Sequence, residues 1–283
     1  TFSYALMFIG IIGVAYGFFT TPSSVEDVKV MLQESHDTHG EAAATTQDND
    51  AHANEASSHD SVHSDDAHAE HVFHLLKNKP WSALYVALFF FFIISLGTLA
   101  FYAIQHASQA GWSPVLFRVM EAISYYLLPG AIAVLAIALW AGPHIFIWMD
   151  PDVVAHDELI QNKSSWLNTS WFAIRGIIFI AGWSAYRFFS RKFSIAQDNA
   201  DINDNSNFKK NFRISAAFLV FYIYTESMMS WDWIMSVDPH WFSTLFGWYV
   251  FASMFVSGIT VLSLISKEAS TVDSSPKNQQ TPS

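Results

Sequence analysis

The chain has 283 residues, of which 52% are hydrophobic, 16% aromatic and 14% charged. A soluble domain usually carries about 25% charged residues, so this composition favours a membrane protein. The formal net charge of −11 comes without a basic segment of the kind that binds nucleic acid. The absence of cysteine excludes disulfides, iron–sulfur ligation and thiolate chemistry by the chain itself.

Six apolar runs are long enough to cross the hydrocarbon core of a bilayer as helices. We therefore predict an all-α protein, a polytopic transmembrane helical bundle with six spans. The predicted spans are Phe2–Phe19, Trp81–Ile104, Leu116–Ala141, Leu167–Phe188, Phe212–Trp233 and Thr244–Ser266. The first span lacks a positively charged start and a small-residue cleavage site, which favours a retained helix over a cleaved signal peptide. In the third span, Pro129 and Gly130 predict a kink.

The spans divide the chain into four segments. We expect a first transmembrane helix over residues 1–19, a disordered outer loop over 20–79, a five-helix transmembrane region over 80–266 and a disordered tail over 267–283. The loop is acidic and rich in histidine, with His36, His39, His52, His59, His63, His68, His71 and His74. Such a loop could trap metal ions or buffer protons, but the irregular histidine spacing favours a solvated linker. We predict no defined metal site.

The distribution of basic residues predicts the topology. Six spans place both termini on one side of the membrane, and that side collects Arg187, Arg191, Lys192, Lys209, Lys210, Arg213 and Lys267. The positive-inside rule therefore places both termini in the cytoplasm. The histidine-rich loop, the segment from His144 to Ser165 and the turn at Asp238–His240 then share the outer face.

Ionisable residues within the spans are the candidates for function, because they are costly at that depth. Tyr222, Glu226, Met229 and Trp233 recur at intervals of four, three and four, so they share one helix face. Burial disfavours the charged form of a carboxyl group, so Glu226 could give and take a proton near neutral pH. Alternatively, Glu226 pairs with a buried arginine, for which Arg175 is the obvious candidate.

A second set of candidates lies near the two membrane faces. Arg118 and Glu121 are three residues apart on one helix face and can form an ion pair. That pair has either a structural role or a place in a proton path. On the outer side, Asp232, Asp238, His240 and Trp233 are candidates for contact with a quinone, although Asp238–Pro239–His240 also fits a simple capped turn.

Several classes of site can be excluded. A membrane b-type haem needs histidines deep within the spans, whereas His106, His144 and His240 lie at span ends. The sequence contains no phosphate-binding glycine loop, no nucleophile elbow and no HExxH motif.

The residues around the fifth span carry a family resemblance. The run TESMMSWDWIMSVDPHWFSTLFGWYVFASMFVSGI resembles the NrfD-like membrane subunit of bacterial alternative complex III, the ActF-type "quinone-binding subunit 2". The resemblance extends through SRKFSIAQD, FIWMDPDVV, GWSPVLFRVMEAIS and KNKPWSALYVALFF, and covers roughly Phe2 to Ile265. Members of the family continue with further helices, so we expect this chain to be truncated after the sixth.

The resemblance implies a place in a respiratory quinol:electron-acceptor oxidoreductase of the bacterial inner (cytoplasmic) membrane. The implied partners are a sister NrfD-like subunit, an iron–sulfur subunit and c-type cytochromes, which hold the haem and iron–sulfur groups. The chain itself binds no redox cofactor, although menaquinone or another quinone is a possible ligand. In the family, quinol oxidation is assigned mainly to the sister subunit, and this subunit is thought to offer a proton route. The matching positions are Glu226, Asp232, Asp238 and His240, with Arg118, Glu121 and Arg175 at charged helix positions.

Two other functions fit the same residues. One is a secondary transporter or proton channel that uses Glu226 and Arg175, and the other is a purely structural scaffold subunit. Sequence alone does not establish that the chain is an enzyme.

Overall fold

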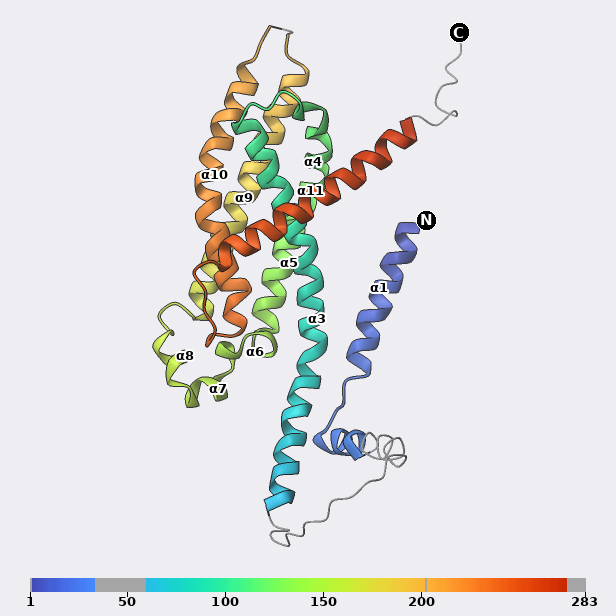
Figure 1. The fold of residues 1–283 in the computed structure, drawn as a ribbon, viewed down its shortest axis with the longest axis vertical. Helices are drawn as coiled ribbons and strands as arrows, with labels where there is room; N and C mark the ends of the chain where they lie inside the picture. Colours follow the sequence, from blue (N-terminus) through green and yellow to red (C-terminus); the bar gives the residue numbers. More distant parts are fainter. Residues whose placement is uncertain (1, 34–59, 202, 274–283) are drawn as a thin grey trace, which may run out of the picture. The chain divides into compact units, whose positions relative to one another are not determined.

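The computed structural model describes residues 2–33, 60–201 and 203–273. Over these residues the protein is all-helical, which confirms the all-α part of the predicted fold class. The long helices are α1 (Phe2–Phe19), α3 (Asp60–Ala107), α5 (Leu127–Trp140), α9 (Thr169–Asp198), α10 (Ser206–Trp233) and α11 (Phe246–Asp273) (Figure 1). Short helices connect them, namely α4 (Phe117–Ile123), α6 (Gly142–Ile145), α7 (Pro151–His156) and α8 (Glu158–Asn162).

Four helical stretches are long and apolar enough to cross a membrane. They are Val72–Ala107, Ser113–Trp140, Thr169–Asp198 and Phe246–Glu268, and they coincide with the second, third, fourth and sixth predicted spans. The first predicted span is helical as α1 and contains the apolar stretch Phe8–Phe19. The fifth predicted span is helical as α10. Its Tyr, Thr, Ser and Glu residues make it less apolar, so it is not among these four stretches. The structure therefore supports a membrane-embedded helical protein.

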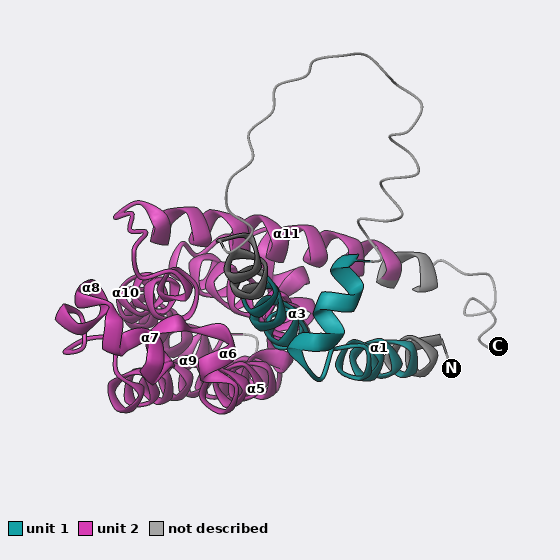
Figure 2. Cartoon of the chain, turned by 90° about the horizontal axis from the view of Figure 1, so that it is seen from below, with its two compact units in different colours: residues 1–84 teal, residues 85–283 magenta. Residues whose placement is uncertain are grey.

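The chain divides into two compact units, residues 1–84 and 85–283, which Figure 2 colours separately. In the first unit, the rings of Phe18 and Trp81 meet edge to face with centroids 4.8 Å apart. In the second unit, α9 packs along α10, and α5 and α11 pack against α9 and α10 respectively. The candidate site residues all lie in the second unit.

The structure differs from the predicted disordered loop and tail in three places. Residues 25–33 are helical, α3 begins at Asp60, and α11 continues to Asp273. A helix that has already formed over an apolar span extends readily into flanking residues because the cost of nucleation has been met. The segments 34–59 and 274–283, which hold His36, His39, His52 and His59, lie outside the described residues.

The kink predicted at Pro129 and Gly130 takes the form of a break before them. Helix α4 ends at Ile123, a 3₁₀ turn follows over Ser124–Tyr126, and α5 begins at Leu127. Proline is tolerated in the first turn of a helix, where its missing N–H has no partner to lose. The proline therefore sits at the start of a new helix instead of within a continuous one.

Three aromatic rings at the centre of the second unit join α3, α9 and α10. Phe92, Trp183 and Trp233 are each at most 1% exposed. Their ring centroids lie 5.9 Å (Phe92–Trp183), 5.6 Å (Phe92–Trp233) and 6.3 Å (Trp183–Trp233) apart. Such offset and edge-on pairs add to the stabilisation from burial alone. This cluster fixes the C-terminal half of α10, on which the main candidate residues lie.

Helix α11 crosses α3 at a point where the two backbones are in contact (Figure 1). A Cβ atom at Gly97 would overlap the carbonyl oxygen of Met254, and one at Gly258 would lie 2.9 Å from the backbone nitrogen of Thr98. Only glycine permits so close an approach. The crossing brings α11 against α10 as well, and so closes one side of the candidate site.

We predict that Gly97→Ala destabilises the protein by about 1–3 kcal/mol, because the new methyl group forces the two backbones apart. Thermal unfolding in detergent measures the change. Gly13→Ala is the matched control, since a Cβ there meets nothing within 4 Å. An equal effect of the two substitutions would contradict the role assigned to the crossing.

Candidate functional site

A cavity of about 190 Å³ lies between α3, α10 and α11, and Glu226 is the ionisable carboxyl group in its wall. The other lining residues are Ile104, Leu219, Tyr222, Ile223, Ser227, Trp248 and Phe251. Glu226 is 3% exposed, and its Oε1 has no hydrogen-bond partner among the described residues. Its Oε2 accepts a long hydrogen bond of 3.4 Å from Ser227 Oγ. The cavity has room for water, which could bind the free oxygen.

The helix face predicted from the sequence is the buried face of α10. Tyr222, Glu226, Met229 and Trp233 are all at most 3% exposed, which confirms that they share the side that packs inward. Tyr222 donates a hydrogen bond to the sulfur of Met254 on α11, with an O–S distance of 3.0 Å. This contact holds the tyrosine one helical turn from Glu226 in the wall of the same cavity.

The arginine expected to pair with Glu226 has a different partner. Arg175 binds Asp232, with Nε 2.5 Å from Oδ2 and Nη2 3.1 Å from Oδ1. Asp232 has no exposed surface, and its Oδ1 also accepts a hydrogen bond of 2.9 Å from the indole nitrogen of Trp166. The guanidinium group of Arg175 stacks on the Trp166 ring, 4.2 Å from its centroid. The predicted pairing of Arg175 with Glu226 is therefore wrong, because a carboxylate six residues further along α10 takes the bidentate position.

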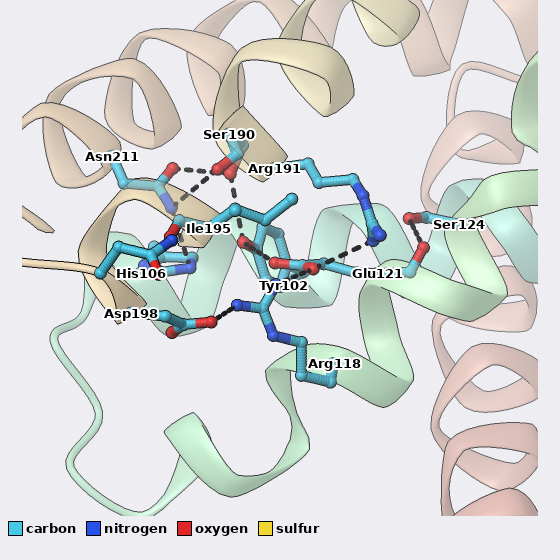
Figure 3. A network of polar contacts seen from close by, with 11 residues as sticks. Tyr102, His106, Arg118, Glu121, Ser124, Ser190, Arg191, Ile195, Asp198 and Asn211 are labelled. Carbon is cyan, nitrogen blue, oxygen red and sulfur yellow. Dashed lines mark hydrogen bonds and ion pairs between the residues drawn. The ribbon is translucent and has the colours of Figure 1, made fainter. Parts of the chain in front are cut away.

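Glu121 occupies a second buried site, in which both carboxylate oxygens are bound (Figure 3). Its Oε2 lies 2.7 Å from Arg118 Nη1 and 3.2 Å from Arg191 Nη1, and its Oε1 accepts a hydrogen bond of 3.1 Å from the Tyr102 hydroxyl. The predicted Arg118–Glu121 pair is confirmed. Arg118 also forms an ion pair with Asp198 near the end of α9. The cluster thus joins α3, α4 and α9.

A chain of buried hydrogen bonds extends from this cluster to His106 (Figure 3). Ser190 Oγ lies 3.3 Å from the Tyr102 hydroxyl and donates to Asn211 Oδ1 at 2.6 Å. Asn211 Nδ2 lies 3.2 Å from His106 Nε2. These residues come from α3, α9 and α10, and each is at most 3% exposed. The chain therefore links the carboxylate of Glu121 to a buried imidazole.

The turn at Asp238–His240 is a separate, exposed arrangement. His240 Nε2 lies 2.8 Å from Asp157 Oδ2, and the backbone N–H of His240 donates to Asp238 Oδ1 at 3.1 Å. Lys163 donates to the carbonyl oxygen of Pro239 at 2.5 Å. Asp238 therefore acts as the turn cap that was one of its two predicted roles. His240 is half exposed, at 50%.

The four residues predicted to contact a quinone do not line one cavity. Asp232 is bound by Arg175 and Trp166, and Trp233 packs in the aromatic centre, where its carbonyl oxygen accepts a hydrogen bond of 2.8 Å from Tyr85. Asp238 and His240 lie in the exposed turn. None of the four is in the wall of the Glu226 cavity. Contact of these residues with a quinone stays a prediction.

Sequence reasoning missed Tyr102, Arg191, Ser190, Asn211 and the pairing partner of His240. The partners in the Glu121 cluster are 19 and 70 residues from Glu121 in the chain, so only the fold brings them together. One signal was present, because Tyr102 and His106 are four residues apart and lie on one helix face. Polar residues at that spacing near the end of an apolar span indicate a buried polar contact.

In the described part of the chain, no group of three or more His, Asp or Glu residues is arranged to hold a metal ion. A comparison with known protein families and with curated proteins found no match.

We predict that Arg175→Met destabilises the protein by about 3–5 kcal/mol, because it leaves the carboxylate of Asp232 buried without its partner. The double substitution Arg175→Met/Asp232→Leu should recover most of the loss, since it removes both charges. Unfolding in detergent measures both. Arg213→Met, at an exposed position of α10, is the matched control and should change stability by at most about 0.5 kcal/mol. A double variant as unstable as the single one would contradict the pairing.

We predict that acid loosens the first turn of α8. The backbone N–H of Ile160, followed by the charge of His240, holds the pKa of Asp157 below its usual value of 3.8. A lowered pKa in the folded state stabilises the fold above the unfolded pKa, and this contribution is lost as the pH falls through the folded value. Hydrogen exchange at the Leu159 and Ile160 amides, corrected for intrinsic rates, should therefore rise below about pH 4.

Asp157→Asn is the control for this prediction. Asparagine retains the capping oxygen but does not ionise, so exchange at the same amides should lose its extra dependence on pH. Protection that is equally sensitive to acid in the variant would show that another group is responsible.

Proposed function

We propose that the chain is an integral membrane subunit of a respiratory quinol:electron-acceptor oxidoreductase, of the alternative complex III type. In this proposal it crosses the bacterial cytoplasmic membrane six times, with both termini in the cytoplasm, and supports quinol oxidation by giving protons a path. The family resemblance, the four long apolar helices and the charge bias of the connecting segments support it.

The observation that carries the proposal is that the buried carboxyl group of Glu226 has no ion-pair partner among the described residues. A carboxyl group in an apolar cavity is costly unless it is paired, and Glu226 has neither an ion pair nor a second strong hydrogen bond among the described residues. Its free oxygen can therefore accept or release a proton without breaking an existing contact. A group of this kind is suited to carrying protons and unsuited to holding helices together.

In the Glu121 cluster, by contrast, both carboxylate oxygens are bound by neighbouring side chains. Three donors already bind its two oxygens, so a proton arriving there would displace an arginine or a tyrosine contact. The geometry favours a structural role for Arg118 and Glu121, which were candidates for the proton path. Arg175 and Asp232 are bound to each other in the same way. In the proposed path, Glu226 is the proton-carrying group and Tyr222 lines its cavity.

The redox chemistry belongs to other subunits in this proposal. The chain has no cysteine, and the predicted quinone-contacting residues do not converge, so we assign quinol oxidation and electron transfer to partners. These are a sister NrfD-like subunit, an iron–sulfur subunit and c-type cytochromes. This chain would then move protons that the partner chemistry releases or consumes.

The alternative of a transporter that uses Glu226 and Arg175 together loses its main support, because Arg175 is bound to Asp232. A scaffold subunit has no need of an unpaired buried carboxyl group. The scaffold alternative is therefore tested by the same substitution as the proton path.

We predict that Glu226→Gln leaves the complex assembled but lowers its quinol turnover by roughly 10²-fold or more, because glutamine has nearly the same shape yet carries no exchangeable acid proton. Turnover and proton release are measured with the purified complex in liposomes. Glu158→Gln, an exposed position in α8, is the matched control and should behave as the unchanged complex.

Unchanged quinol oxidation and proton translocation in an assembled Glu226→Gln complex would contradict the proton path and leave the scaffold role. Proton flux through the chain alone, without quinol or partners, would instead favour the channel.

A further inference from the structure

A second cavity lies at the end of the second unit where α9 begins and α10 ends, and the proposed function does not use it. It has a volume of about 370 Å³ and lies between the segment 162–167 and the segment that follows α10. Its lining includes Lys163, Trp166, Trp231, Trp241 and Phe242. The cavity thus combines one cationic side chain with four large aromatic rings.

Lys163 is the cationic hydrogen-bond donor in the wall of this cavity, and it can bind a further acceptor. Lys163 donates to the Pro239 carbonyl, and its ammonium group has further N–H bonds to offer. No described carboxylate forms an ion pair with it. The ammonium group of Lys163 therefore binds best to a negatively charged oxygen.

The carboxylates nearest in the fold are already engaged. Asp232 is bound by Arg175 and by Trp166, whose ring lines the cavity. Asp157 and Asp238 face His240. None of these acids is in the cavity wall, so the positive charge of Lys163 is not cancelled there.

The outer part of the cavity is apolar and open. Trp241 is 50% exposed and Phe242 is 77% exposed. Tryptophans that gather at the ends of apolar helices mark the level of the lipid headgroups. A ligand that brings a negative oxygen to Lys163 and an apolar body to Trp241 and Phe242 is an amphiphile at a membrane surface.

We propose that this cavity binds the headgroup of an anionic phospholipid. The phosphodiester oxygens accept hydrogen bonds from Lys163, and the acyl chains lie against Trp241 and Phe242. The net negative charge of the lipid balances the uncancelled charge of Lys163. The site is independent of the Glu226 cavity, whose walls it does not share.

Native mass spectrometry of the delipidated full chain tests the proposal, with phosphatidylglycerol and phosphatidylcholine of identical acyl chains as probes. We expect tighter retention of phosphatidylglycerol. Lys163→Gln should weaken that binding about fivefold, which is what one basic residue near an anionic lipid contributes.

Two controls separate this site from general attraction to a charged surface. Lys192→Gln, an exposed lysine near the other end of α9, should leave the affinity unchanged. Lys163→Arg should retain it, because the charge remains. Equal retention of the two lipids, or binding that Lys163→Gln does not alter, would overturn the proposal. Displacement of the lipid by glycerol phosphate at equal concentration would show that the cavity binds soluble phosphates, and would also overturn it.

Discussion

The pairing of Arg175 with Asp232 determines what the other buried charges of the second unit can do. Arg175 binds both carboxylate oxygens of Asp232, and Trp166 takes part through both its ring and its carbonyl oxygen. Arg175 is held by Asp232, and among the described residues Glu226 has no counterion. The two carboxylates, six residues apart on α10, therefore lie in different surroundings.

The two buried glutamates show how the same side chain takes different roles in different surroundings. Glu121 accepts from two guanidinium groups and a phenol, so its charge is balanced and its position is fixed. Glu226 has one long contact to a neighbouring serine and an open cavity beside it. Low dielectric strengthens the first arrangement and makes the second one costly. This difference in hydrogen bonding supports a structural role for Glu121 and a role in proton exchange for Glu226.

Local patterns in the sequence predicted the helices and the inward face of α10 because both follow from spacing along one element. Apolar runs located the four helices now seen to be long enough for a membrane, and the four-three-four spacing placed Tyr222 and Glu226 correctly. The Arg118–Glu121 pair was predictable for the same reason, since its members are one turn apart. The pairing of Arg175 with Asp232 and that of Glu121 with Arg191 could not be predicted in this way, because the partners lie 57 and 70 residues apart in the chain. Which carboxylate an arginine reaches depends on helix packing that no local pattern encodes.

Helix α9 supplies an arginine to each of the two buried acids outside the Glu226 cavity. Arg175 meets Asp232 of α10, and Arg191 meets Glu121 of α4. At about 1.5 Å per residue, the two arginines stand about 24 Å apart along the helix, so α9 neutralises charge near both of its ends. The same placement constrains the assembly of the helices. Without α9, Glu121 has only Arg118 as a cationic partner among the described residues, and Asp232 has none. The packing of α4 and that of α10 therefore both depend on α9, which lies between them in the sequence.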